Sequence, residues 1–239
     1  MTKPEKIVLY CLPFAGGNSY SYRLLKTHFC DFIEMVSIEL PGRGKRSHEP
    51  LLTCLESLAQ DVVRQVQQKE KHHPYAIFGH SMGAILGYLA THQLLTEGFP
   101  LPQHLFFSGR RAPSISVEEN RHKLPKPEFL MALKKLEGCP KEILENEEFI
   151  DIFEPILRAD FKAIETWNVR KFFPLDIPIT VLLGTHDTEL NETEALAWEK
   201  ETLHPVTIKK FQGGHFFIFD QTTKVCQSIS QTLRSVLLN

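Results

Sequence analysis

The chain has 239 residues, a formal net charge of −2 and 42% hydrophobic residues. This length allows one domain with a sizeable core, and the near-neutral charge argues against nucleic-acid binding. No apolar stretch reaches membrane-spanning length, and residues 1–6 lack the apolar core of a signal peptide. Scattered cysteines, odd in number and without CxxC spacing, predict reduced thiols in a cytoplasmic protein: Cys11, Cys30, Cys54, Cys139 and Cys226.

Short apolar runs alternate with amphipathic stripes along the chain. We expect strands at 7–12, 35–40, 75–78, 105–108, 178–184 and 206–211. Helices are expected at 20–29, 55–66, 84–90, 193–202 and 225–238. Such alternation predicts an α/β fold with a mainly parallel sheet and helices on both faces.

One gap breaks this alternation. About seventy residues separate Ser108 from Pro178, where a crossover helix needs only about a dozen. Three apolar stripes, punctuated by prolines such as Pro155, predict helices in this stretch. We interpret it as a helical lid at about 113–175, within a single domain spanning 1–239; a merely stabilising subdomain is the alternative. Four apolar side chains of this stretch are expected to line a substrate channel: Phe129, Leu133, Phe153 and Leu157.

The pentapeptide Gly79-His80-Ser81-Met82-Gly83 lies between an expected strand and an expected helix. A G-x-S-x-G sequence in this context is typical of a nucleophile elbow, a tight turn that lifts the serine hydroxyl out of the sheet. The pentapeptide alone occurs often by chance. The alternative is therefore a glycine-rich turn whose serine has no catalytic role. The strand before it and the helix after it favour Ser81 as a nucleophile.

A serine nucleophile needs a histidine to take its proton and an acid to orient that histidine. In the fold that carries this elbow, the acid and then the histidine follow the serine. Asp187 lies just past the strand at 178–184, and Glu189 is the second choice. His215 follows two glycines after the last strand, whereas His204 precedes that strand. We therefore predict a triad of Ser81, Asp187 and His215.

Two backbone N–H groups are needed to bind the oxyanion of the tetrahedral intermediate. One should be the N–H of Met82, directly after the nucleophile. The other should come from the loop after the first strand, Pro13-Phe14-Ala15-Gly16-Gly17. Proline has no N–H, so we expect the Phe14 N–H to donate, with Ala15 as the second choice.

Taken together, these segments resemble the type II thioesterases of the α/β-hydrolase fold, which accompany polyketide synthases and nonribosomal peptide synthetases. The resemblance covers essentially the whole chain, and the segments after the second and fourth strands make it more specific than the elbow alone. Six strands are evident, fewer than the eight of the full fold, so we expect the N-terminal hairpin to be missing. The matching segments are 12–17, 40–44, 79–83, 108–113, 157–161, Asp187 and 214–217.

The resemblance implies a cytoplasmic enzyme without metal or bound cofactor, which hydrolyses acyl groups from the phosphopantetheine arm of an acyl or peptidyl carrier protein. Members typically clear stalled or misloaded acyl groups. Release of medium-length acyl chains, a general carboxylesterase and an acyltransferase are the alternatives. We expect no membrane partner and favour a monomer.

Carrier proteins of this class are acidic, so a local basic patch should receive them. Two groups of cations follow strand ends, and a third group lies at the start of the predicted lid. The first two groups contain the candidates Arg43, Arg110 and Arg111. Further members are Lys45, Arg46, Arg121, Lys123 and Lys126.

Overall fold

The structure is a computed structural model. It describes residues 6–69, 73–115, 119–136, 146–168 and 172–238. No helix of these residues is long and apolar enough to span a bilayer. Cys11, Cys30, Cys54 and Cys226 are free thiols, and Cys139 lies outside the described residues.

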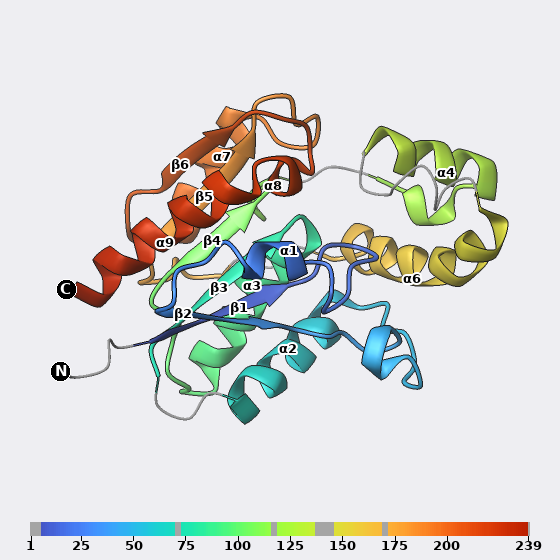
Figure 1. The fold of residues 1–239 in the computed structure, drawn as a ribbon. Coiled ribbons are helices and arrows are strands. Elements are labelled where there is room, and N and C mark those ends of the chain that lie inside the picture. Colours follow the sequence, from blue (N-terminus) through green and yellow to red (C-terminus); the bar gives the residue numbers. More distant parts are fainter. Residues whose placement is uncertain (1–5, 70–72, 116–118, 137–145, 169–171, 239) are drawn as a thin grey trace.

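A six-stranded sheet with strand order β2-β1-β3-β4-β5-β6 forms the centre of the molecule, and every neighbouring pair is parallel (Figure 1). The carboxyl ends of all six strands therefore meet at one edge, and the strand order reverses at β1 and β3, where such sheets bind ligands. The α/β-hydrolase fold class is confirmed. The strands are β1 Ile7–Leu12, β2 Ile33–Ser37, β3 Tyr75–His80, β4 Leu105–Ser108, β5 Ile179–Gly184 and β6 Thr207–Phe211.

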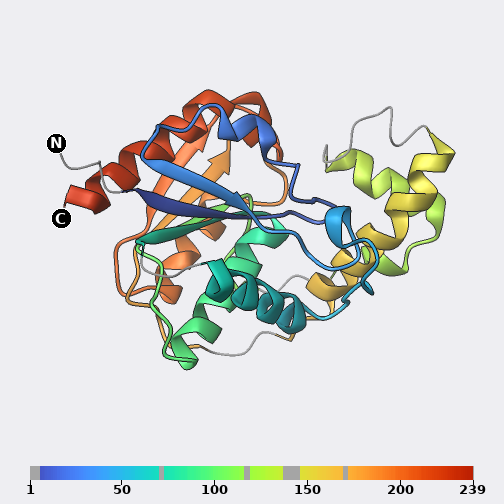
Figure 2. The same cartoon turned by 60° about the horizontal axis from the view of Figure 1, so that its bottom comes forward.

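Successive side chains of a strand point to opposite faces, and both faces of this sheet are covered. In β1, Tyr10 packs in one core and Leu9 in the other. Figure 2 shows α2 and α3 on one face and α9 on the other. The first core uses α2 Leu55–Lys69, α3 Met82–Thr96 and α7 Glu192–Leu196. The second uses α1 Arg23–Lys26, α8 Phe217–Asp220 and α9 Thr222–Leu238.

The described part of the segment between β4 and β5 contains the helices α4 Lys126–Lys135 and α6 Glu147–Glu165. They stand together at one end of the molecule, apart from the helices that cover the sheet (Figure 1 and Figure 2). Their apolar faces share a small core of their own. Its buried members are Phe129, Leu133, Ile150, Leu157 and Phe161.

The expectation of separate helices for the apolar stripe at 149–157 and the stripe that begins at Phe161 was wrong. Phe149 and Phe161 lie on the single helix α6, which continues through Pro155, and Trp167 lies beyond the end of α6. Proline inside a helix removes one N–H donor and disfavours the preceding turn. Here the apolar residues on both sides of Pro155 pack into the same core, with Ile150 before it and Phe161 after it. This shared burial offsets the cost of the proline.

Candidate active site

Ser81 occupies a sharp turn between β3 and α3. Its φ of 52° and ψ of −114° make it the one non-glycine residue with a positive φ among the described residues. The turn depends on flanking glycines: a Cβ added to Gly79 would lie 2.1 Å from the Gly83 carbonyl oxygen. The Ser81 N–H donates to the Ser108 carbonyl at 2.7 Å. This is the geometry of a nucleophile elbow, in which backbone strain presents the hydroxyl above the sheet.

Asp187 and His215 lie side by side after β5 and β6. The His215 Nδ1 is 3.0 Å from both carboxylate oxygens of Asp187. Both side chains are buried, at 5% exposure for His215 and 0% for Asp187. His215 and Ser81 line the same pocket. No hydrogen bond joins the Ser81 hydroxyl to the His215 ring, although the structure describes both residues.

The alternative acid and base serve other contacts. Glu189 points its carboxylate to Arg121, with both oxygens 2.9 Å from Nη2, while its backbone N–H donates to Asp187. His204 is paired with Asp176 at 2.9 Å on an exposed surface. The geometry therefore favours Asp187 over Glu189 and His215 over His204.

His80, next to the nucleophile, is a buried neighbour of His215. Their ring centroids are 4.9 Å apart. Burial, and then the proximity of His215, lowers the pKa of His80 well below its ordinary value, so its ring stays neutral. Its Nδ1 is hydrogen-bonded to Ser108 Oγ at 2.9 Å. His80 thus packs beneath the site without adding a charge to it.

The loop after β1 lies against the elbow. Leu12 pairs with Gly79, and a Cβ added to Gly83 would lie 2.3 Å from the Leu12 carbonyl oxygen. Within this loop the Gly17 N–H donates to the Phe14 carbonyl and the Gly16 N–H donates to Asp160. Among the described residues, no acceptor is found for the Phe14 N–H. Met82 begins α3, where an N–H has no acceptor within the helix. Both N–H groups are therefore available to an oxyanion.

The pocket beside Ser81 and His215 has a volume of about 680 Å³, open solvent at its mouth included. Of the four expected channel residues, Leu133 and Leu157 line it. Phe129 is buried in the core of the inserted helices, and Phe153 packs against that core. The sequence interpretation missed apolar lining residues that helical spacing alone does not distinguish from core: Leu136, Phe161, Ile164 and Phe216.

The expectation that Arg43 docks a carrier protein was wrong, because Arg43 is only 2% exposed. Its two terminal nitrogens bind both carboxylate oxygens of Asp160, at 2.6 and 2.7 Å. Asp160 lies in α6 and is fully buried. A buried cation needs such a partner, and the pairing removes Arg43 from the surface.

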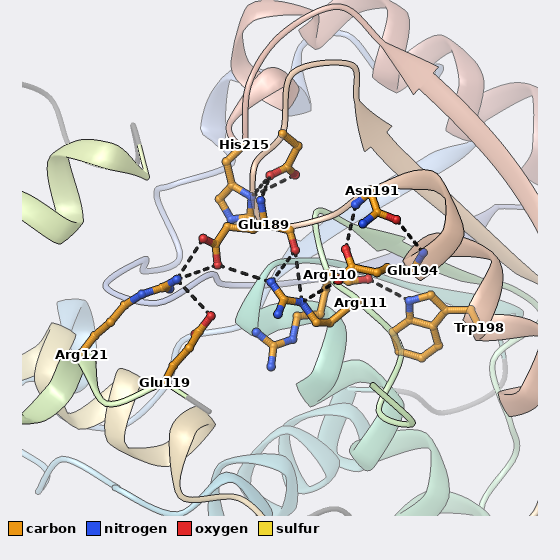
Figure 3. Close-up of polar contacts among 10 residues, drawn as sticks. Arg110, Arg111, Glu119, Arg121, Glu189, Asn191, Glu194, Trp198 and His215 are labelled. Carbon is orange, nitrogen blue, oxygen red and sulfur yellow. Dashed lines mark hydrogen bonds and ion pairs between the residues drawn. The ribbon is translucent and has the colours of Figure 1, made fainter. Parts of the chain in front are cut away.

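Arg110 and Arg111, the other two docking candidates, both line the pocket, and Figure 3 shows the polar contacts around them. Their role in docking stays a prediction. Arg111 donates through Nε and Nη2 to the Glu189 carbonyl oxygen, at 3.2 and 2.7 Å. Arg121 lines the pocket too and pairs with Glu119 and Glu189. The sequence placed these arginines among the docking candidates but did not predict that Glu119 and Glu189 pair with Arg121, because Glu189 lies 68 residues away in the chain.

Comparisons with known proteins agree with this architecture. Residues 8–233 match the thioesterase domain family. The gramicidin S biosynthesis protein GrsT of Aneurinibacillus migulanus is 32% identical over 97% of this chain and 91% of that protein. Thioesterase PikA5 of Streptomyces venezuelae is 33% identical over 94% of this chain and 80% of that protein.

Solved structures show the same similarity. The crystal structure of ClbQ, from the colibactin NRPS/PKS pathway, has a TM-score of 0.93 and 33% identity, and the match covers 98% of this chain and 99% of ClbQ. The family match spans most of the chain, and the identities exceed 30% along nearly its full length. The chain therefore belongs to the thioesterase domain family and is a serine hydrolase of the type II thioesterase class, as its sequence motifs predict.

Proposed function

We propose that this enzyme hydrolyses acyl thioesters on the phosphopantetheine arm of a carrier protein, through an acyl-enzyme on Ser81. The observation that carries the proposal is the bidentate contact of Asp187 with His215 Nδ1, beside the pocket that also holds Ser81. Buried Asp187 orients the imidazole and stabilises its cation, which leaves Nε2 as the base. This arrangement suits acyl transfer through a serine.

In the first step the Ser81 oxygen attacks the thioester carbonyl while His215 Nε2 takes the hydroxyl proton. The N–H groups of Met82 and Phe14 stabilise the oxyanion, and each such donor contributes about 3–4 kcal/mol. The carbon–sulfur bond breaks, and the pantetheine thiolate receives the proton from His215. Water, deprotonated by His215, then attacks the acyl-serine; the carboxylic acid leaves and Ser81 regains its proton.

The biological role we propose is editing: the removal of stalled or misloaded acyl groups in polyketide or nonribosomal peptide assembly. The relatives support this role, since GrsT is a gramicidin S biosynthesis protein and ClbQ belongs to the colibactin NRPS/PKS pathway. We place the enzyme in the cytoplasm, where its free thiols would stay reduced. The carrier protein is its partner in this proposal.

The test is a panel of carrier proteins loaded with different acyl groups, read by intact mass. Wild type is expected to unload them, whereas Ser81→Ala, with an unchanged unfolding temperature, should lose at least about a thousandfold in rate. Matched acyl thioesters and oxygen esters distinguish a thioesterase from a carboxylesterase. Near-normal turnover by a folded Ser81→Ala protein contradicts the mechanism, and transfer to an acceptor other than water contradicts hydrolysis.

Carrier docking needs exposed cations, which Lys45 and Lys123 supply. Lys126 is engaged with Asp151 at 2.6 Å. We expect the double substitution Lys45→Glu/Lys123→Glu to lower kcat/KM for an acyl-carrier protein about tenfold, and added salt to lower it too. The control is Lys224→Glu, at an exposed position of α9. Equal losses on carrier-bound and free acyl-pantetheine would contradict a docking role.

A further inference from the structure

The guanidinium of Arg110, at the active site, is paired with no carboxylate of the described residues. Arg110 follows β4, and its carbonyl oxygen is held by the Trp198 indole N–H at 2.8 Å. Its side chain lines the pocket that also holds Ser81 and His215. Among the described residues, no hydrogen bond or ion pair reaches its guanidinium, and its Nε is buried without an acceptor. In Figure 3 no dashed line reaches this guanidinium.

The nearby acids are already engaged with other arginines. Both oxygens of Glu189 are 2.9 Å from Arg121 Nη2, and one lies 3.9 Å from Arg111. Glu119 is paired with Arg121 at 3.1 Å. Three arginines and two glutamates line the pocket, and a third acid, Glu194, lies 4.0 Å from Nε of Arg111. Burial, and then Arg111, lowers the pKa of Arg110 to about 10, which still leaves the side chain protonated at neutral pH.

Arg110 is half-buried, with Nε fully shielded from water. A shielded charge without a partner is costly, and a bound anion would lower that cost. A planar guanidinium binds a carboxylate or a phosphate through two parallel hydrogen bonds. The substrate offers two sources for such an anion: the acyl group, and the phosphate of the pantetheine arm. Their distances from the thioester differ, so the position of Arg110 separates them.

The backbone that carries Arg110 passes close to the reacting centre. A Cβ added to the preceding Gly109 would be 3.1 Å from His215 Cε1 and 2.7 Å from His80 Cε1. The arm's phosphate is separated from the sulfur by two amide units, whereas an acyl substituent lies within a few bonds of the carbonyl carbon. The pocket also has an apolar side, to which Leu133 and Leu157 contribute. One side of the pocket thus suits an alkyl chain, and the other suits a charge on the acyl group.

We propose that Arg110 binds a carboxylate carried by the acyl group, so that the enzyme accepts dicarboxylic acyl thioesters such as malonyl or succinyl. The inference rests on the proposed function, because it names a substrate class for the same site. Arg110 is then a specificity-determining residue, and the chemistry remains with the serine, histidine and aspartate.

The test compares malonyl and butyryl thioesters of N-acetylcysteamine, which are similar in size and carry no phosphate. We expect Arg110→Met to lower the malonyl-to-butyryl ratio of kcat/KM by about 10- to 100-fold, the usual effect of losing hydrogen bonds to a charged group. Arg110→Lys keeps the positive charge but cannot form the two parallel hydrogen bonds of a guanidinium, so its malonyl-to-butyryl ratio should lie between those of wild type and Arg110→Met. The control is Arg23→Met, an exposed arginine of α1 that is not part of the pocket. Thermal unfolding verifies that each variant is folded.

A ratio that stays constant in both Arg110 variants overturns the inference, while butyryl hydrolysis by wild type still supports the thioesterase function. Repeating the comparison with coenzyme A thioesters, which carry phosphates, tests the other anion source. If Arg110→Met slows malonyl- and butyryl-coenzyme A equally and spares both phosphate-free substrates, Arg110 binds phosphate and the acyl assignment is wrong. A wild type that hydrolyses none of these thioesters overturns the proposed function and the inference together.

Discussion

The carboxylate of Asp160, in the inserted helix α6, accepts a hydrogen bond from the backbone N–H of Gly16 at 2.7 Å. The same carboxylate holds the buried guanidinium of Arg43. Gly16 lies two residues after Phe14, whose N–H we propose as an oxyanion donor. Asp160 therefore ties the inserted helix to the loop that positions this donor, and we regard it as a positioning residue.

Asp160→Asn should destabilise the protein by about 3–5 kcal/mol, because it leaves the buried Arg43 charge unpaired. It should also lower kcat more than it raises KM, because the loop that carries the Phe14 N–H loosens. Urea unfolding and steady-state kinetics measure the two effects. The double variant Arg43→Met/Asp160→Leu removes both charges and should recover stability but not kcat. If kcat recovers together with stability, Asp160 has only a structural role.

Asp187→Asn should lower kcat by about 10⁴-fold with a small change in KM, because it disturbs the orientation and tautomer of His215. Glu189→Gln is the matched control, since Glu189 is also an acid after β5 but contacts arginines instead of His215. Its effect on kcat should be far smaller. A larger loss in Glu189→Gln than in Asp187→Asn would show that the acid has been assigned to the wrong residue.

Leu157→Ala should shift the preference of the enzyme toward longer acyl chains, because Leu157 lines the pocket and its truncation enlarges the space beside Ser81. The substitution should also cost about 2–5 kcal/mol of stability. Phe129→Leu serves as the control, because Phe129 is fully buried in the same small core but does not line the pocket. The chain-length preference is measured as kcat/KM for a series of acyl thioesters of increasing length. A shift of equal size in both variants would argue against a channel at Leu157.

His104 should make stability fall in mild acid. Burial, and then His204, lowers the pKa of His104 to about 4 from its ordinary 6.5. Between these values the unfolded chain binds the proton more tightly, so the free energy of unfolding decreases as pH falls from about 6.5 to 4, by up to about 3 kcal/mol. His104→Gln should flatten part of this slope in urea unfolding at pH 7 and pH 5. His28→Gln, at an exposed position, is the control; identical slopes in wild type and His104→Gln would contradict the prediction.

Local sequence was sufficient to predict six strands and the triad candidates, although the second strand, expected at 35–40, lies at Ile33–Ser37. The expected strands at 7–12 and 105–108 match β1 and β4, because continuous burial on both faces of a parallel sheet leaves unbroken apolar runs. Ser81 and Asp187 each follow such a run, whereas His215 follows the edge strand β6, in which only Phe211 is buried. Parallel strands bring the carboxyl ends of all three strands to one edge. Chain order and strand ends therefore carried most of the information about this site.

Tertiary structure decided which charged residues are buried. In the sequence Arg43 resembles its exposed neighbour Lys45, and only the approach of Asp160, 117 residues later, places it in the interior. In the described part of the chain the guanidinium of Arg110 has no ion-pair partner, and the nearby carboxylates contact Arg111 and Arg121, from segments that the fold brings together. Helical spacing likewise could not separate the pocket residue Leu133 from the core residue Phe129. Periodicity reports that a side chain is buried, whereas its partner depends on long-range packing, which no local pattern contains.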